Sequence, residues 1–146
     1  MRSLVIDIDK RCNANCVHCC LGCTPDAKEY ISDDEIDMII NYAEKCPELK
    51  RVSITGGEPL LRKNKVIETI NRVSKLGKDT TLITNGFWAK DKKQTDEILL
   101  RLYQSGLKAL TVSYDEYHAK YIPYDCIRNL FEEVKKYPIS VANKFT

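Results

Sequence analysis

Short apolar runs alternate with amphipathic stretches along the whole chain. The runs predict strands because they are short, rich in β-branched residues and bounded by turn residues. They occupy residues 3–8, 51–55, 80–84, 109–113 and 139–141. Between them, apolar residues recur at the spacing of one helical face, over residues 32–43, 66–77, 98–106 and 123–134. We therefore predict an α/β fold of four strand–helix units and a fifth strand, with parallel pairing and right-handed crossovers.

Each chemically unusual segment directly follows a predicted strand. These segments are the cysteine-rich loop and the turns TGGEP, TNGFW and SYDEYH. In parallel α/β sheets the carboxyl ends of the strands meet at one rim, where ligands bind. We therefore expect four loops to converge there and form the functional site.

The predicted strands have one apolar and one polar face. The polar positions that share a face are Asp7, Ser53, Thr55, Thr111 and Ser113. A fully packed barrel is usually apolar on both faces of its strands, so a polar face favours a lined cavity. The alternative is that edge strands simply present one face to water.

Composition and charge exclude several classes of protein. The chain has 146 residues, enough for one domain with its own core, and its 43% apolar and 30% charged content is typical of soluble globular proteins. The 23 basic and 21 acidic residues are interspersed, which argues against a nucleic-acid partner. No apolar run reaches the ~18–20 residues of a membrane span, and the N-terminus lacks a secretory signal pattern. We expect a cytoplasmic protein without a membrane partner.

Cysteine is the most informative residue type. Five of the seven cysteines lie between Cys12 and Cys23, and their odd total argues against a secreted disulfide framework. Cys12, Cys16 and Cys19 have the spacing Cx3Cx2C, and thiolates suit zinc or iron–sulfur clusters. Three ligands would leave one iron of a cubane open for chemistry. Alternatively, Cys20 or Cys23 could complete a zinc site, join a second metal site, or be a spare thiol.

The turn Gly56-Gly57-Glu58 supports the cluster interpretation. Adjacent glycines let backbone approach a ligand closely, and the carboxylate could pair with the ammonium group of S-adenosylmethionine. An ordinary strand-to-helix turn also explains two glycines. The combination with three nearby cysteines on one predicted rim is more specific than either feature alone.

The segments CNANCVHC and ITGGEP, supported by LITNGFWA and VSYDEYHAKYIP, resemble the radical S-adenosylmethionine (radical SAM) enzyme superfamily. The resemblance runs from about residue 3 to 142. It implies a single core domain over residues 1–146 with a partial (βα) barrel, about (βα)4 plus a fifth strand. It also implies a [4Fe–4S] cluster on Cys12, Cys16 and Cys19, with S-adenosyl-L-methionine bound beside it.

The same resemblance implies cofactor contacts elsewhere. In the superfamily, the residue before the third cysteine and the fifth strand lie near the adenine. The Gly-Gly-Glu turn contacts the methionine amino group, and the ends of strands three and four reach the ribose or the carboxylate. The matching positions here are His18, Gly56, Gly57, Glu58, Asn85, Ser113, Asp115 and Val141.

The implied reaction begins when the reduced cluster cleaves S-adenosylmethionine to a 5′-deoxyadenosyl radical, which takes a hydrogen atom from a substrate. The TNGFWA and DEYH segments suggest a peptide substrate, and flavodoxin or ferredoxin would donate the electron. His118, the weak catalytic candidate, could move a proton or hold substrate, or only hydrogen-bond its neighbours.

Other hypotheses remain open at this point. The superfamily core has six strand–helix units, whereas this chain reaches only the fifth strand. A truncated product, a minimal enzyme completed by a partner chain or by self-association at the open edge, and an inactive remnant all fit that length. The alternative functions are an activase for a glycyl-radical enzyme, and a non-enzymatic module that binds zinc or a cluster.

Overall fold

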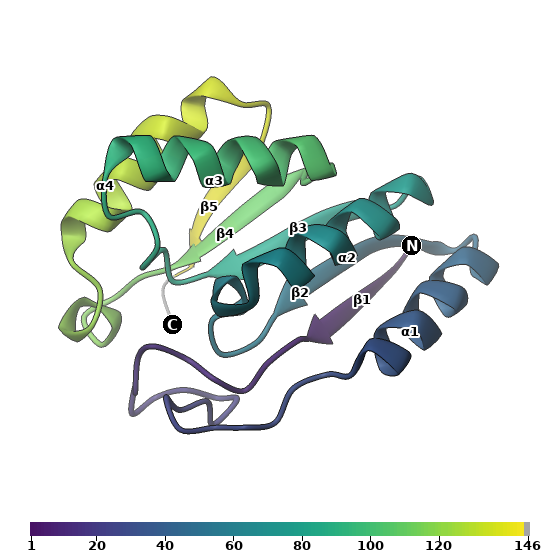
Figure 1. The fold of residues 1–146 in the computed structure, drawn as a ribbon, viewed down its shortest axis with the longest axis horizontal. Helices are drawn as coiled ribbons and strands as arrows, with labels where there is room; N and C mark the ends of the chain where they lie inside the picture. The colour runs from purple at the N-terminus through teal and green to yellow at the C-terminus, as the bar shows by residue number, and fades with distance from the viewer. Residues whose placement is uncertain (145–146) are drawn as a thin grey trace.

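The computed structural model describes residues 1–144 and contains one parallel five-stranded sheet in the order β1-β2-β3-β4-β5 (Figure 1). The strands are β1 (Arg2–Asp7), β2 (Leu49–Thr55), β3 (Asp79–Thr84), β4 (Ala109–Ser113) and β5 (Ser140–Lys144). The α-helices that connect them are α1 (Asp33–Lys45), α2 (Lys63–Lys75), α3 (Lys92–Ser105) and α4 (Tyr124–Glu133). Short 3-10 helices are η1 (Pro59–Arg62), η2 (His118–Lys120) and η3 (Val134–Lys136). The predicted (βα)4β order is confirmed.

Local sequence determines where several helices begin and end. Ser32 caps α1 in a capping box. The Glu35 amide donates to the Ser32 hydroxyl at 3.2 Å, and the Ser32 amide donates to the Glu35 carboxylate at 2.7 Å. Asp91 caps α3 by accepting from the Gln94 amide at 2.8 Å. Gly77 follows α2 with a φ of 74°, a left-handed conformation that favours glycine.

The two faces of the sheet differ as the alternation predicted. The helices cover one face, where the apolar strand residues form the core. Its most buried strand residues are Ile6, Val52, Ile54, Leu82, Leu110 and Val112, each at most 2% exposed. The other face carries the polar residues, and there the Thr81 hydroxyl donates to the Ser53 hydroxyl at 2.6 Å. This arrangement leaves a polar surface that ends at the rim of the sheet.

The loop between β1 and α1, residues 8–32, is called here the cysteine loop. Its two ends are joined because the Ile31 amide donates to the Ile8 carbonyl at 3.1 Å, and the Lys10 amide donates to the Glu29 carbonyl at 3.0 Å. The Arg62 guanidinium donates to the carbonyls of Ile8 and Ile31, which fastens this stem to η1. The loop therefore leaves and rejoins the fold beside the carboxyl end of β1 (Figure 1).

Over residues 1–144, no helix is long and apolar enough to cross a membrane.

Candidate cofactor-binding site

A cavity of about 440 Å³ lies at the carboxyl ends of the strands. One wall carries the thiols of the cysteine loop, those of Cys12, Cys16, Cys19, Cys20 and Cys23. The ends of β2, β3 and β4 supply polar lining residues, which include Thr55, Gly56, Gly57, Asn85 and Ser113. His18 also lines the cavity from the cysteine loop, and His118 lines it from η2, after β4. All four segments that sequence placed on one rim therefore meet at one cavity, whose volume falls in the range of ligand pockets, about 300–1,000 Å³.

The two glycines after β2 admit the backbone of the cysteine loop. The Gly57 amide donates to the Asp9 carbonyl at 2.6 Å, and the Glu58 amide donates to the Arg11 carbonyl at 2.9 Å. A Cβ atom on Gly57 would lie 2.1 Å from the Arg11 carbonyl oxygen, and one on Gly56 would lie 2.6 Å from that of Asp9. The backbone of the cysteine loop therefore excludes side chains at Gly56 and Gly57, whereas the sequence suggested that these glycines let a ligand approach closely. The glycines still line the cavity, so both reasons can hold.

The cavity thiols form no disulfide, and burial favours the neutral thiol at three of them, Cys12, Cys16 and Cys23. Burial raises the pKa of Cys12 to about 11 and that of Cys23 to about 12, and it also raises the pKa of Cys16. A positively charged metal centre would be needed to stabilise thiolates at neutral pH. The cysteine thiols are therefore the soft donors that an iron–sulfur cluster needs, and they would lose their protons when they bind the metal.

The thiols do not form the compact group that a single ion requires. Over residues 1–144, no three cysteine sulfurs lie within 4.8 Å of one another. A single zinc ion would hold its sulfurs about 4 Å apart, because each Zn–S bond is about 2.3 Å long and the geometry is tetrahedral. A cubane binds each sulfur at a different corner and so holds them farther apart. The structure thus does not bring Cys20 or Cys23 into a compact zinc site.

Glu58 lies beneath the cavity rather than in its lining. Its side chain is 0% exposed and accepts hydrogen bonds from the Thr84 hydroxyl at 2.6 Å, the Asn85 amide at 2.7 Å and the Leu60 amide at 3.1 Å. Burial raises the pKa of Glu58 to about 7, although these three bonds oppose the rise. The carboxylate therefore supports the turns after β2 and β3, and its pairing with a ligand ammonium stays a prediction.

Thr84 and Asn85 connect the end of β3 to the rest of the site. The Thr84 hydroxyl donates to Glu58 and accepts from the Trp88 indole at 3.0 Å. The Asn85 side-chain amide donates to the side-chain Oδ1 of Asn13 at 2.9 Å and lies 3.8 Å from the Cys12 sulfur. Sequence analysis missed Thr84 and Asn13. A threonine at a strand position otherwise used for the core was the available signal for Thr84.

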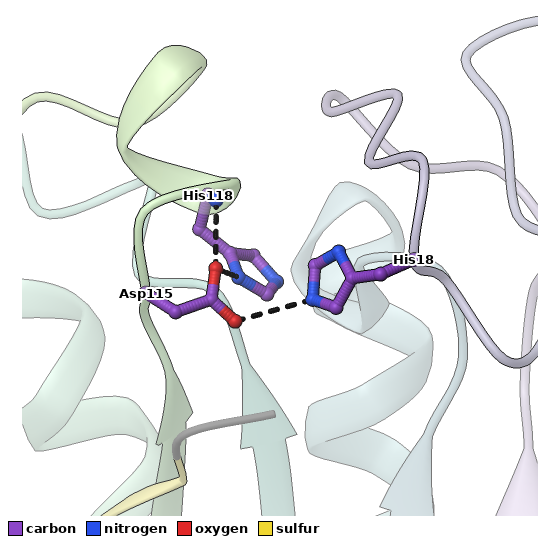
Figure 2. A group of neighbouring side chains, drawn as sticks. All are labelled: His18, Asp115 and His118. Carbon is purple, nitrogen blue, oxygen red and sulfur yellow. Dashed lines mark hydrogen bonds and ion pairs between the residues drawn. The ribbon is translucent and has the colours of Figure 1, made fainter.

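Asp115 joins the two histidines of the chain (Figure 2). One carboxylate oxygen lies 3.1 Å from His18 Nε2, and the other lies 2.8 Å from His118 Nδ1. The second oxygen also accepts from the backbone amides of Tyr117 and His118, each at 3.0 Å. Burial alone would raise the pKa of Asp115, but the bonds from His118 and Tyr117 hold this pKa well below its usual range.

The ring of His18 is held from two further directions. It lies against Tyr117 with ring centroids 4.4 Å apart, and edge-on to His118 at 5.4 Å. Tyr117 was not predicted as a site residue, and only its place in the SYDEYH segment pointed to it. Val141, in contrast, packs against the core and does not line the cavity, so the structure does not bring this predicted adenine contact to the site.

Comparisons with known proteins agree with this geometry. The chain matches the family model of the Radical SAM superfamily over residues 7–140. It is 34% identical over 137 residues to the putative peptide biosynthesis protein YydG of Bacillus subtilis, covering 94% of this chain and 43% of that protein. It is 30% identical over 135 residues to a probable GTP 3′,8-cyclase of Pyrococcus horikoshii, covering 92% of this chain and 41% of the relative. The chain thus spans less than half the length of these two curated relatives.

Solved structures share the fold. BtrN in complex with AdoMet and 2-DOIA gives a TM-score of 0.74 at 16% identity, covering 98% of this chain and 56% of that one. The structure of anSMEcpe, with bound AdoMet and a peptide, gives a TM-score of 0.67 at 17% identity, covering 97% of this chain and 42% of that one. Both the predicted partial barrel and the predicted family are therefore confirmed. The chain belongs to the radical SAM superfamily, whose members use a [4Fe–4S] cluster and S-adenosylmethionine.

Proposed function

We propose that this chain is the core domain, residues 1–146, of an enzyme that cleaves S-adenosylmethionine reductively. Cys12, Cys16 and Cys19 would hold a [4Fe–4S] cluster. The observation that carries the proposal is a single cavity whose lining includes these three cysteines together with the glycine turn, Asn85 and Ser113. When bound, the cluster would supply the electron that breaks the sulfonium–carbon bond, which yields the 5′-deoxyadenosyl radical.

The protein would position both cofactors. The Asn85 side-chain amide lies 3.8 Å from the Cys12 sulfur, where an N–H group can tune a cluster's reduction potential. His18 lines the cavity beside Cys19 and is held by Asp115, so its ring would form one wall of the adenine site. The backbone of Gly56 and Gly57 and the hydroxyl of Ser113 would face the amino-acid and ribose portions of S-adenosylmethionine.

Anaerobic reconstitution of the chain with iron and sulfide tests this proposal. We expect about four iron and four sulfide per chain, and release of 5′-deoxyadenosine when S-adenosylmethionine and a reductant are added. One tightly bound zinc per chain and no 5′-deoxyadenosine would overturn the proposal in favour of a zinc module.

Single cysteine variants locate the third ligand. We expect Cys16→Ser and Cys19→Ser to lose both the cluster and the cleavage. Cys20→Ser is the matched control, because Cys20 is the next residue and also lines the cavity. It should keep both properties. Loss of the cluster in Cys20→Ser with retention in Cys19→Ser would transfer the assignment to Cys20.

We further propose a peptide as the substrate. The relative with 34% identity is named as a putative peptide biosynthesis protein, which supports this class. Substrate-dependent acceleration of 5′-deoxyadenosine release can be measured with candidate peptides encoded beside the gene. GTP is the comparison arm, because other relatives are GTP 3′,8-cyclases. Acceleration by GTP alone would reject the peptide class without affecting the cleavage proposal.

Three further expectations belong to the same proposal. Flavodoxin or ferredoxin would reduce the cluster. The free thiols favour a reducing compartment such as the cytoplasm. Over residues 1–144, β5 pairs with β4 alone, so its other edge could accept a partner chain or a second copy. Size-exclusion chromatography with light scattering would show whether the chain self-associates.

A further inference from the structure

The two histidines of the chain and one carboxylate gather at a single point. His18 belongs to the cysteine loop, whereas Asp115 follows β4 and His118 begins η2 (Figure 2). One potential ligand atom from each residue lies within 4.8 Å of the other two. Over residues 1–144, this is the one group of three histidine, cysteine or acidic side chains that meets this distance. Segments about one hundred residues apart in sequence therefore converge on one small volume.

The separations are close to those of ligands around one small ion. A zinc-class ion binds nitrogen and carboxylate oxygen at about 2.0–2.2 Å, which places neighbouring ligand atoms about 3–3.5 Å apart. One carboxylate oxygen of Asp115 already lies 3.1 Å from His18 Nε2, and the other lies 2.8 Å from His118 Nδ1. Small side-chain rotations would suffice to place an ion where hydrogen bonds now join these groups.

The group is also fixed before any ion arrives. The side chains of His18, Asp115 and His118 are 22%, 10% and 14% exposed, so each has little freedom. The backbone amides of Tyr117 and His118 hold one oxygen of Asp115, and the Tyr117 ring supports His18. Such supporting contacts orient metal ligands and increase affinity in known sites.

We propose that His18, Asp115 and His118 bind a divalent transition-metal ion of the zinc class. Two imidazoles and one carboxylate suit Zn²⁺, Co²⁺ or Ni²⁺, whereas Mg²⁺ and Ca²⁺ prefer sets made of oxygen ligands alone. Three protein ligands leave a fourth position, which water can fill on the side of the cavity that His18 and His118 line. The ligand set contains no cysteine, although His18 directly precedes Cys19 and lines the same cavity, and the proposal does not depend on the proposed cleavage activity.

Occupancy would link the cysteine loop to the loop after β4. His18 would be held by the ion instead of being available to a nucleotide. If the proposed function is also correct, zinc at this site and S-adenosylmethionine should therefore oppose each other.

Histidine-selective ¹⁵N NMR tests the site directly, because the chain contains only two histidines. The probe is Zn²⁺, titrated into the reduced, cluster-free full chain. We expect the ring-nitrogen signals of both histidines to shift together and to saturate at one equivalent beyond any zinc taken by cysteines. Zinc bound only by cysteines would leave the ring signals of His118 unchanged, whether or not His18, the neighbour of Cys19, moves, and that result would overturn the proposal.

Variants distinguish coordination from indirect effects. His118→Gln should abolish the shift of His18, and Asp115→Asn should weaken zinc binding at least tenfold. Glu116→Gln is the matched control, because it removes an adjacent exposed carboxylate outside the group and should bind like the parent. The dispersion of the backbone amide spectrum shows whether each variant is folded. A folded His118→Gln chain in which His18 still shifts with unchanged affinity would overturn the assignment.

Discussion

Gly57 shows how one missing side chain can determine the position of a whole loop. Its amide holds the Asp9 carbonyl, and the backbone of Arg11 and Cys12 passes directly over its Cα atom. A methyl group there would meet the Arg11 carbonyl oxygen at 2.1 Å, so the backbone carrying Cys12 would have to move. The glycine therefore positions a proposed cluster ligand without touching the cluster.

We expect Gly57→Ala to destabilise the fold by about 1–3 kcal/mol or more, as overpacking against backbone does. It should also reduce the iron content after reconstitution. Urea unfolding and iron analysis measure the two effects. Gly22→Ala, in the cysteine loop, is the comparison for iron content: its φ of 63° makes alanine cost roughly 1–2 kcal/mol as well, but a methyl group there meets nothing within 4 Å. Equal iron content in both variants would contradict the proposed positioning role.

Glu58 predicts a specific dependence of stability on pH. Burial raises its pKa to about 7 in the folded chain, above the ~4.3 of an unperturbed glutamate. The folded state then binds the proton more tightly than the unfolded state. The stability this provides is fully present below about pH 4 and is lost as pH rises through about 7.

Between about pH 4 and pH 7 the loss of unfolding free energy should be roughly 3–4 kcal/mol. The measurement is the free energy of unfolding from urea titrations between pH 5 and 8, compared with Glu58→Gln. Because glutamine does not titrate, the parent should lose more stability than this variant as pH rises. Glu116→Gln, which changes an exposed residue, should follow the parent. Parallel curves for the parent and Glu58→Gln would show that Glu58 does not carry the effect.

The sequence predicted which residues lie at the rim of the sheet. It did not predict where all of their side chains point. Cys12, Cys16 and Cys19 line the cavity as expected, since all three lie in one short loop tied to the sheet. Glu58 lies at the expected turn, but its carboxylate folds inward to cap η1 and to meet Thr84. That inward turn depends on partners from other elements, and a single sequence does not reveal how they pair.

At the scale of elements, the strands and helices lie where periodicity placed them. Alternation of period two and apolar stripes of period 3.6 are local properties, so α2, for example, follows from its own residues and ends before Gly77. What periodicity could not supply is the bonding between the turns after β2 and β3. There the Thr84 hydroxyl bridges Glu58 and Trp88, which makes two turns into one unit.

Removing that bridge should loosen both turns. Thr84→Val keeps the shape of the side chain but removes one partner from each of three groups, the buried Glu58 carboxylate, the Trp88 indole and the Gly86 amide. An unsatisfied buried polar group costs about 1–3 kcal/mol, so we expect a loss of stability in that range. Chemical denaturation followed by Trp88 fluorescence measures it. Thr84→Ser, which keeps the hydroxyl, should recover most of the loss, and failure to do so would assign the effect to packing.

At the scale of the whole molecule, the cavity thiols lie on the least regular segment of the fold, the cysteine loop. The cysteine loop contains no helix or strand between residues 8 and 32, and backbone hydrogen bonds hold its stem and its contact with the glycine turn. A cluster bound by Cys12, Cys16 and Cys19 would cross-link three points of this loop. Because it would bind the folded chain and not the unfolded one, it should add to the stability of the entire fold.

Cluster loading should therefore raise the melting temperature. For a chain of this size, each kcal/mol of stabilisation corresponds to roughly 2–4 °C, so a gain of several degrees is expected. Anaerobic circular dichroism of the reconstituted and cluster-free chains measures the gain, with iron content determined on the same samples. Cys16→Ser should melt at the same temperature before and after reconstitution, whereas Cys20→Ser should gain as much as the parent. A fully loaded parent that melts no higher than the cluster-free chain would mean that the metal centre binds the folded and unfolded loop equally well. The cysteine loop would then be held in place by the hydrogen bonds of the protein itself, among them those to Gly57, Glu58 and Arg62.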